Sequence, residues 1–174
     1  MVSINDFMQN FKGGGARADK FRAHVTYPSA VTTPSVQDYI VISTAELPGS
    51  TVSPTFVFFQ GRQIPLFGDR QLEPFTMTIL NDIDFGHRNA FETWLNAIQS
   101  HESNIQSDPN YQNLLGVVQI DQLDRNDNIL KTIKLMNAFP NMMSPIMLDY
   151  GATDQVEVYS ISMSYSHWTS TLTT

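Results

Sequence analysis

The chain contains no cysteine among its 174 residues. It therefore has no disulfide bond, no thiolate ligand for a metal and no cysteine nucleophile. No apolar run approaches the length of a membrane span, and Met1–Lys12 mixes Asn, Asp and Gln with its apolar residues, unlike a signal peptide. We therefore expect a protein that is cytosolic when made and has no membrane segment.

Charged residues are scarce, at 16% of the chain where soluble domains average about a quarter. A surface rich in Ser, Thr, Asn and Gln favours a protein largely covered by copies of itself, although secreted proteins share such compositions. The net charge of −7 divides into +2 for residues 1–22 and −9 for the remainder. An acidic body repels phosphates, which argues against a protein that grips nucleic acid.

Sequence motifs for catalysis are also lacking. No two of the four histidines have the spacing of a metal-binding pair, and no serine lies in a Gly-x-Ser-x-Gly turn. Asp82 and Asp84 are expected to cap a helix, with His87 at its surface or capping it. The carboxylates of residues 121–127 fall in a predicted turn that lacks the glycine and final glutamate of a calcium-binding loop. We expect no enzyme activity, no catalytic residue, no bound metal and no cofactor.

Alternating side chains predict that most of the chain is β-strand. From Lys20 onward, apolar Phe21, Ala23 and Val25 alternate with polar residues, which is typical of a half-buried strand. The other predicted strands are Tyr39–Glu46, Leu72–Leu80, Leu114–Leu123, Ile129–Met136, Met147–Tyr150 and Gln155–Trp168. Turn residues predict hairpins across 124–128 and 151–154, with a loop over Phe139–Pro145.

One convincing helix is predicted at about 85–100. Its apolar residues recur at helical spacing at Phe91, Trp94, Leu95 and Ile98. The fold class is therefore mainly β, with antiparallel strands and one flanking α-helix. No internal repeat or shift in composition divides residues 16–174, so we expect a single β domain there.

The last predicted strand carries a stripe of serines. Ser160, Ser162 and Ser164 alternate with the apolar residues Tyr159 and Ile161. Such a face suits water or a subunit boundary. Burial in the core is disfavoured, because each hydroxyl group would need a hydrogen-bonding partner.

An apolar segment lies between Thr51 and Gly68. It includes Phe56 and Phe58 but is interrupted by prolines and by Gly61, which predicts a hairpin turn at residues 60–62. Exposed on a monomer, such a segment would promote aggregation. It therefore either folds onto the core or forms a partner surface.

The first residues predict a short amphipathic helix capped by Ser3 or Asn5. Its apolar positions are Ile4, Phe7, Met8 and Phe11. Gly13–Gly15 ends the helix and lacks the strand and the Lys-Ser/Thr pair of a phosphate-binding loop, so it is interpreted as a tether. Residues 1–15 are then either a frayed terminus or an assembly arm that orders on a neighbour.

Several short sequences, taken in order, resemble those of the tail tube proteins of contractile-tailed bacteriophages. They are Ala16–Arg22, Thr44–Gly49, Phe67–Arg70, Thr76 with Thr78, Leu80–Asp82, Phe91–Trp94, Ala138–Pro140, Met147–Tyr150 and Tyr165–Trp168. Their order covers nearly the whole chain.

The resemblance implies a β-sandwich-like barrel whose inner strands join between subunits into a hexameric ring. Rings of this family stack into a tube inside a contractile sheath, through which phage DNA passes without specific binding. An acidic wall that repels phosphates would suit that passage. The implied location is the tail of the virion, after assembly in the host cytoplasm. The alternative is the tube of a bacteriocin or a type VI-like contractile injection system.

The implied partners are further copies of the chain, the tail sheath protein, and the baseplate tube-initiator and tail terminator proteins. The N-terminal arm and residues 47–69 are expected to contact adjacent subunits or rings, and the basic residues 1–22 to meet an acidic neighbour. The expected contact residues are Phe7, Phe11, Arg17, Pro54, Phe56, Phe58, Arg62, Ile64 and Phe67. The serine face is expected either to line the lumen or to contact a neighbouring subunit.

Overall fold

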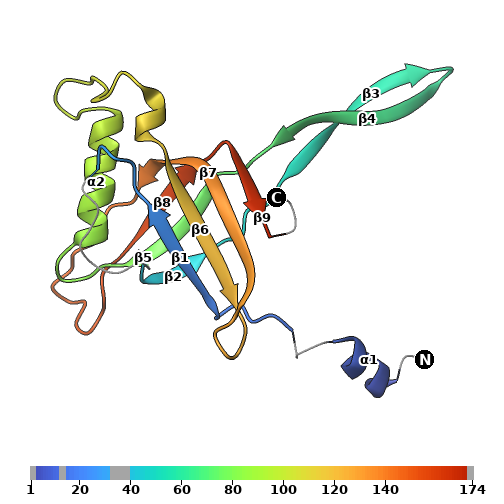
Figure 1. The fold of residues 1–174 in the computed structure, drawn as a ribbon, viewed down its shortest axis with the longest axis horizontal. Helices are drawn as coiled ribbons and strands as arrows, with labels where there is room; N and C mark the ends of the chain where they lie inside the picture. The colour runs from blue at the N-terminus through green and yellow to red at the C-terminus, as the bar shows by residue number, and fades with distance from the viewer. Residues whose placement is uncertain (1–2, 12–14, 32–39, 172–174) are drawn as a thin grey trace.

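A computed structural model of the chain describes residues 3–11, 15–31 and 40–171 (Figure 1). Its elements are α1 (Ile4–Asn10), β1 (Phe21–Thr26), β2 (Ile42–Ala45), β3 (Thr51–Phe59), β4 (Arg62–Gln71), β5 (Phe75–Leu80), α2 (Gly86–Ile98), the 3-10 turn η2 (Tyr111–Leu114), β6 (Gly116–Leu123), β7 (Ile129–Met143), β8 (Val158–Ser164) and β9 (His167–Ser170). Within the described residues, all strand pairs are antiparallel. The predicted mainly β fold with one flanking helix is confirmed.

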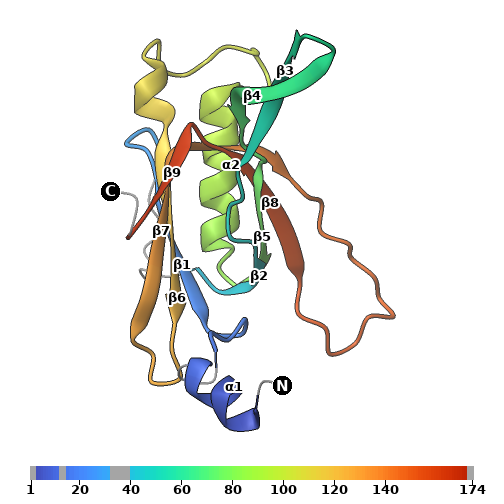
Figure 2. The same cartoon turned by 90° about the vertical axis from the view of Figure 1, so that its right-hand side faces the viewer.

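Seven strands form one sheet that bends into two layers. The first layer contains β1, β6, the first part of β7, and β9, while the second contains the end of β7 with β8, β5 and β2. Strand β7 belongs to both, because residues 129–138 pair with β6 and residues 139–143 pair with β8. Figure 2 shows the two layers side by side, and Figure 1 shows α2 at one end of both.

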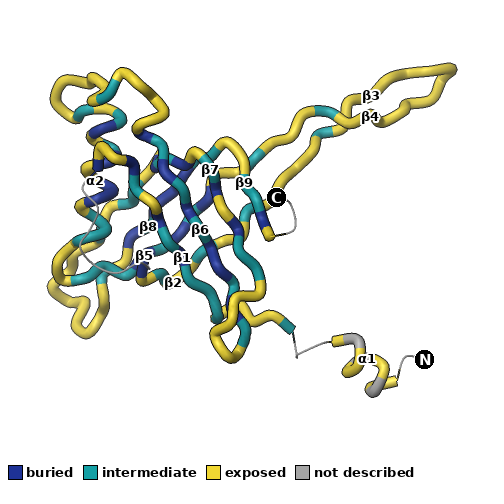
Figure 3. Tube along the Cα trace, viewed as in Figure 1, coloured by how far each residue is buried: buried dark blue, intermediate teal, exposed yellow. Residues whose placement is uncertain are grey.

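The core lies between the two layers and follows the predicted alternation. In the second layer, Met77 of β5 pairs with Ile161 of β8, and both side chains are fully buried. Val118 of β6 and Leu135 of β7 are the buried pair of the first layer. Burial is concentrated in these strands and on one face of α2 (Figure 3).

Helix α2 packs through an aromatic cluster. Phe91 and Trp94 are fully buried, and their ring centroids lie 5.6 and 5.8 Å from that of Tyr27. The indole Nε1 of Trp94 donates a hydrogen bond of 2.8 Å to the carbonyl oxygen of Leu114, so the buried N–H is satisfied. The predicted apolar stripe therefore does anchor the helix.

The start of α2 differs in detail from the expected cap. Phe85 occupies the N-cap position with a left-handed φ of 53° and no side-chain cap. Asp82 still contributes, because its Oδ1 accepts a hydrogen bond of 3.1 Å from the Gly86 amide. Asp84 is exposed.

The predicted loop over Phe139–Pro145 is wrong for most of its length, because β7 continues to Met143. Asn137 has a φ of 54°, a left-handed conformation that allows the strand to turn from one layer into the other. Pro140 lacks an amide hydrogen, yet it is tolerated where β7 pairs with a strand on one side only.

The predicted hairpin between Met147–Tyr150 and Gln155–Trp168 is also wrong. Residues 144–157 form an exposed loop without strand structure, and β8 pairs with β5 and β7 instead. The last strand is interrupted at residues 165–166, where the Ser166 amide donates to the Met136 carbonyl. The alternation of side chains was correct, but it could not reveal this break.

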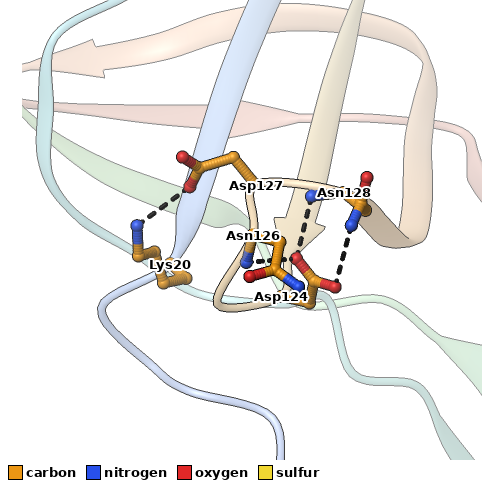
Figure 4. Close-up of polar contacts among 5 residues, drawn as sticks. All are labelled: Lys20, Asp124, Asn126, Asp127 and Asn128. Atoms are coloured by element: carbon orange, nitrogen blue, oxygen red, sulfur yellow. Dashed lines mark hydrogen bonds and ion pairs between the residues drawn. The ribbon is translucent and has the colours of Figure 1, made fainter.

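The turn between β6 and β7 uses the carboxylate of Asp124 (Figure 4). Its Oδ1 accepts hydrogen bonds from the amides of Asn126 and Asn128, at 2.7 and 2.9 Å, and its Oδ2 accepts one from the Asn128 side chain. The side-chain bond from Asn128, followed by its backbone bond, lowers the pKa of Asp124. Asp124 thus forms the turn, as predicted, and Asp127 pairs with Lys20 at 2.9 Å. Asp121 is not a turn residue, because it lies buried within β6 and pairs with Arg22.

Candidate assembly interface

The hairpin of β3 and β4 projects away from the two layers (Figure 1). Its strands pair from Thr51 with Gln71 to Phe59 with Arg62, and neither pairs with any other described strand. Gln60 and Gly61 form the turn with φ values of 48° and 80°, as the Gly61 signal predicted. The segment therefore does not fold onto the core.

The hairpin bears most of the predicted contact residues. Phe58 is 76% exposed and Phe67 is fully exposed. The remaining predicted residues Pro54, Phe56, Arg62 and Ile64 are exposed as well. Gly68 is required by close packing, because a side chain there would clash with the carbonyl oxygen of Ser53. The structure brings these residues together on one element, and their contact role stays a prediction.

The N-terminal helix α1 is capped as predicted by Ser3. The Ser3 hydroxyl accepts a hydrogen bond from the Asp6 amide at 3.2 Å, and the Asp6 carboxylate accepts one from the Ser3 amide at 3.1 Å. Phe11 and Arg17 are exposed, whereas the side chain of Phe7 lies outside the described residues. Ile4 and Met8 are 79% and 68% exposed, so α1 presents apolar side chains without covering them.

The serine stripe lies on the face of β8 that points away from the core. Ser160 Oγ is hydrogen-bonded to Thr78 Oγ1 at 3.2 Å, and Ser164 Oγ accepts a hydrogen bond of 3.0 Å from the Asn141 amide group. Ser162 is only 9% exposed, so the expectation that these serines avoid burial is wrong for this residue. Neighbouring hydroxyl and amide groups provide the partners that burial requires at the other two.

The strands of the second layer carry no charge at all. None of β2, β5, β8 and residues 139–143 of β7 contains Asp, Glu, Lys or Arg. The cross-strand row of Thr44, Thr78 and Ser160 places hydroxyl groups on the outward face, which also exposes the apolar side chain of Val158. The strands of the first layer differ, because they carry Arg22, Asp121, Lys131 and Lys134.

A second exposed region was missed by the sequence analysis. It consists of residues 81–85 and 144–157, which we call the acidic loop surface. Asn81 joins its two segments, because its amide donates to the Glu157 carbonyl at 2.9 Å and its side chain donates to the Glu157 carboxylate at 2.8 Å. A sequence signal was present, since no Lys or Arg follows Lys134.

Two titratable groups, His87 and Tyr27, meet beside the aromatic core. His87 is half-buried rather than on the surface, with Nδ1 hydrogen-bonded to the Tyr27 hydroxyl at 3.2 Å. Burial lowers the pKa of His87 and raises the pKa of Tyr27. Both shifts are explained by desolvation of the charged form.

The described residues offer neither a metal-binding cluster nor a membrane-spanning helix. No three His, Asp or Glu side chains gather there closely enough to hold a metal ion. No helix within residues 3–11, 15–31 and 40–171 is both long and apolar enough to cross a membrane.

Solved structures with the same fold come from contractile injection systems. A sheath/tube terminator of the extracellular injection system PVC, in the extended state, superposes with a TM-score of 0.66 at 15% identity, covering 90% of this chain and 96% of that chain. The PVC sheath–tube complex in the extended state gives a TM-score of 0.63 at 14% identity and covers 98% of both chains. At these identities the likeness concerns the fold alone.

Proteins related in sequence identify the family more specifically than these structures do. The tail tube protein of Serratia phage KSP90 is 28% identical over 169 residues, which cover 95% of both chains. The tail tube protein gp19 of Enterobacteria phage T4 is 22% identical over 168 residues, covering 95% of this chain and 98% of the relative. The phage tail tube protein family itself matches residues 16–171. The resemblance found in the sequence is therefore confirmed, and the chain belongs to the phage tail tube protein family.

Proposed function

We propose that the chain forms hexameric rings that stack into the inner tube of a contractile phage tail, through which DNA leaves the virion. Its role is structural: it takes no part in catalysis and needs no cofactor. Membership of the tail tube family makes the chain a component of the virion.

The observation that carries the proposal is a layer whose two edge strands each have one paired side, apart from a single bridge between Ile40, just before β2, and Ala23 of β1. Among the described strands, β2 pairs along its length with β5 alone, and residues 139–143 of β7 pair with β8 alone. Free edges are a liability on a monomer, and closing a ring of subunits removes them. Strand directions alternate from β2 through β5 and β8 to β7, so β7 of one copy can continue antiparallel into β2 of the next.

The uncharged outward face of this layer supports its assignment to the lumen. A face of Thr44, Thr78 and Ser160 offers neither ammonium nor guanidinium groups to hold phosphates. It also differs from the acidic wall expected from the net charge, because the acids lie outside these strands. DNA would slide along uncharged side chains.

Solved structures of the same fold support the proposed partners. Solved proteins of this fold come from a sheath/tube terminator, a baseplate and a sheath–tube complex. We extend these relationships to this chain, with the tail sheath, the baseplate tube initiator and the tail terminator as its partners. The relatives found by sequence are phage proteins, which favours DNA over protein as the cargo.

Disulfide cross-linking tests the ring. Because the chain has no native cysteine, only the introduced cysteines can form a disulfide bond. In the double variant Ser43→Cys/Asn141→Cys, one cysteine lies on β2 and the other at the free edge of β7. Oxidation should join neighbouring subunits into a ladder that ends at the hexamer on a denaturing gel. Negative-stain electron microscopy of the unmodified protein should show rings or tubes.

A matched control moves the second cysteine from the free edge of β7 to β9. Ser43→Cys/Thr169→Cys should give no ladder, because β9 belongs to the first layer. Persistent monomers under all conditions, or a ladder from the β9 control alone, would contradict the proposed ring.

A further inference from the structure

We propose that the tip of the β3–β4 hairpin of one copy docks on the acidic loop surface of a second copy. This inference rests on the proposed function, because it names the receiving surface for stacking one ring on the next. It adds to that function a specific pair of surfaces, residues 56–67 on one side and residues 81–85 with 144–157 on the other.

Both surfaces expose large apolar side chains. On the hairpin tip, Phe58 and Phe59 are 76% and 61% exposed. On the acidic loop surface, Ile83 and Met147 are 96% and 89% exposed, and Tyr150 is fully exposed. Burying an aromatic ring removes on the order of 150–250 Å² from water, so joining these surfaces is favourable for both.

The charges of the two surfaces are complementary. The acidic loop surface contains five carboxylates and no Lys or Arg; they are Asp82, Asp84, Asp149, Asp154 and Glu157. None of the five forms an ion pair within the described residues. The hairpin tip carries Arg62 as its sole charged residue. An arginine at the tip can therefore pair with carboxylates that have no cation of their own.

The N-terminal arm fits this surface less well. Helix α1 carries Asp6 and no basic residue between Ile4 and Asn10, so carboxylates would repel it. Of the basic residues after the glycine tether, Lys20 and Arg22 already pair with Asp127 and Asp121, and Arg17 lines a hollow together with Asp124 at the β6–β7 turn. Charge thus selects the hairpin as the occupant.

The positions of the two surfaces suit a repeating contact. The hairpin reaches the top of the molecule, whereas residues 144–157 lie low in both Figure 1 and Figure 2. A contact between two different surfaces at opposite ends propagates from copy to copy instead of closing on a pair. The two segments of the acidic loop surface are held together by the Asn81–Glu157 hydrogen bonds, so the receiving surface exists before docking.

Mixed cysteine variants test which surfaces meet. Phe59→Cys protein and Ile83→Cys protein are mixed, allowed to assemble and oxidised. We expect a disulfide between the two variants, identified by mass spectrometry of the joined peptides. Ile4→Cys replaces Phe59→Cys in a parallel mixture, as a matched control on α1, where Ile4 is more exposed than Phe59.

Exchanging the charges of Arg62 and Asp84 gives a second test of the contact. Arg62→Glu and Asp84→Arg each place like charges across the contact and should raise the protein concentration needed for tube formation about tenfold or more, since the loss repeats around each ring. The double variant restores an opposite pair and should return to within about threefold of the unmodified protein. Unchanged melting of the dissociated subunits controls for folding, because both residues are exposed.

The outcomes separate this contact from the proposed function. Tubes that form without the 59–83 disulfide, or with Ile4→Cys joined to Ile83→Cys instead, overturn the contact and leave the tube intact. A dominant disulfide between two Phe59→Cys copies would show tip-to-tip packing and would also overturn it. Failure of the unmodified protein to form rings or tubes contradicts both proposals.

Discussion

At the scale of single residues, His87 links the stability of the fold to pH. Its ring is half-buried at the start of α2 and bonded to the Tyr27 hydroxyl. Burial is the larger influence and lowers its pKa, while the charge of Asp82 acts in the opposite direction. The folded state therefore binds a proton at this site less readily than the unfolded state does.

The lowered pKa of His87 determines how the free energy of unfolding depends on pH. Above the unfolded pKa of about 6.5 His87 is neutral in both states and contributes no pH dependence. As the pH falls through about 6.5 toward the lower folded value, the unfolded state gains the proton first and the free energy of unfolding decreases. We expect His87→Gln to flatten this loss between about pH 7.5 and pH 5.5, as measured by thermal melting. Parallel curves for the two proteins would contradict it.

Gly116 and Gly49 offer a matched pair of substitutions. A Cβ atom at Gly116 would lie 2.5 Å from the Thr26 carbonyl oxygen and 2.6 Å from the Trp94 ring, whereas one at Gly49 meets nothing within 4 Å. Gly116→Ala should lower the free energy of unfolding by about 1–3 kcal/mol. Gly49→Ala should change it by less than about 0.5 kcal/mol. Urea unfolding of the dissociated subunits measures both, and equal effects would refute the packing argument.

At the scale of elements, the β3–β4 hairpin has little to stabilise it in a single copy. An isolated two-stranded hairpin is marginally stable in water, and this one shares no sheet with the body. Its order then depends on contacts that only assembly supplies.

Hydrogen exchange should report this dependence directly. Amides of Phe56–Phe59 should exchange within seconds to minutes in dissociated subunits and slow by about a hundredfold or more in tubes. Amides of Val118 and Ile120, in the core strand β6, should stay protected in both states. A hairpin protected equally in subunits and tubes would show that it is stable on its own.

Elements defined by local pattern were predictable, and those defined by long-range pairing were not. The stripe of Phe91 and Trp94 and the turn at Gly61 sufficed for α2 and the hairpin. The path of β7 beyond Asn137 was missed, because a strand that changes partner keeps its alternation while its neighbours change. Met147–Tyr150 has strand-like side chains but no partner strand. It was wrongly predicted because the local sequence does not determine which strands pair.

At the scale of the whole molecule, the two layers and the acidic loop surface differ in how many charged residues they carry and in the sign of the charge. The four strand segments of the second layer are uncharged, the first layer carries most of the strand charges, and the acidic loop surface is purely acidic. Composition alone revealed an acidic chain with a basic N-terminus. It could not predict the acidic loop surface, because residues 81–85 and 144–157 are joined only by the fold.

The uncharged second layer leads to a prediction for the assembled tube. Thr44 is exposed on its outward face, so Thr44→Lys would place a ring of ammonium groups in the proposed lumen. We expect DNA release from triggered virions to slow about tenfold or more, because DNA would exchange its counterions for the lysines.

Thr44→Gln is the control of similar bulk without charge, and it should release DNA at nearly the normal rate. Thr44 lies on β2, the proposed ring edge, but edge pairing uses backbone groups, so both variants should form tubes of normal length and their length is measured first. Normal release from Thr44→Lys virions would place this face outside the lumen.

The hairpin enters and leaves the body through short connections at residues 46–50 and 72–74 and takes no share of the main sheet. It is therefore physically separable from the residues that build the two layers. Exchanging it between related tube proteins should leave each core intact while changing which chains can polymerise together. Two tubes produced in one infected cell could be kept apart by this insert together with the acidic loop surface that receives it, with no change in the wall that faces the cargo.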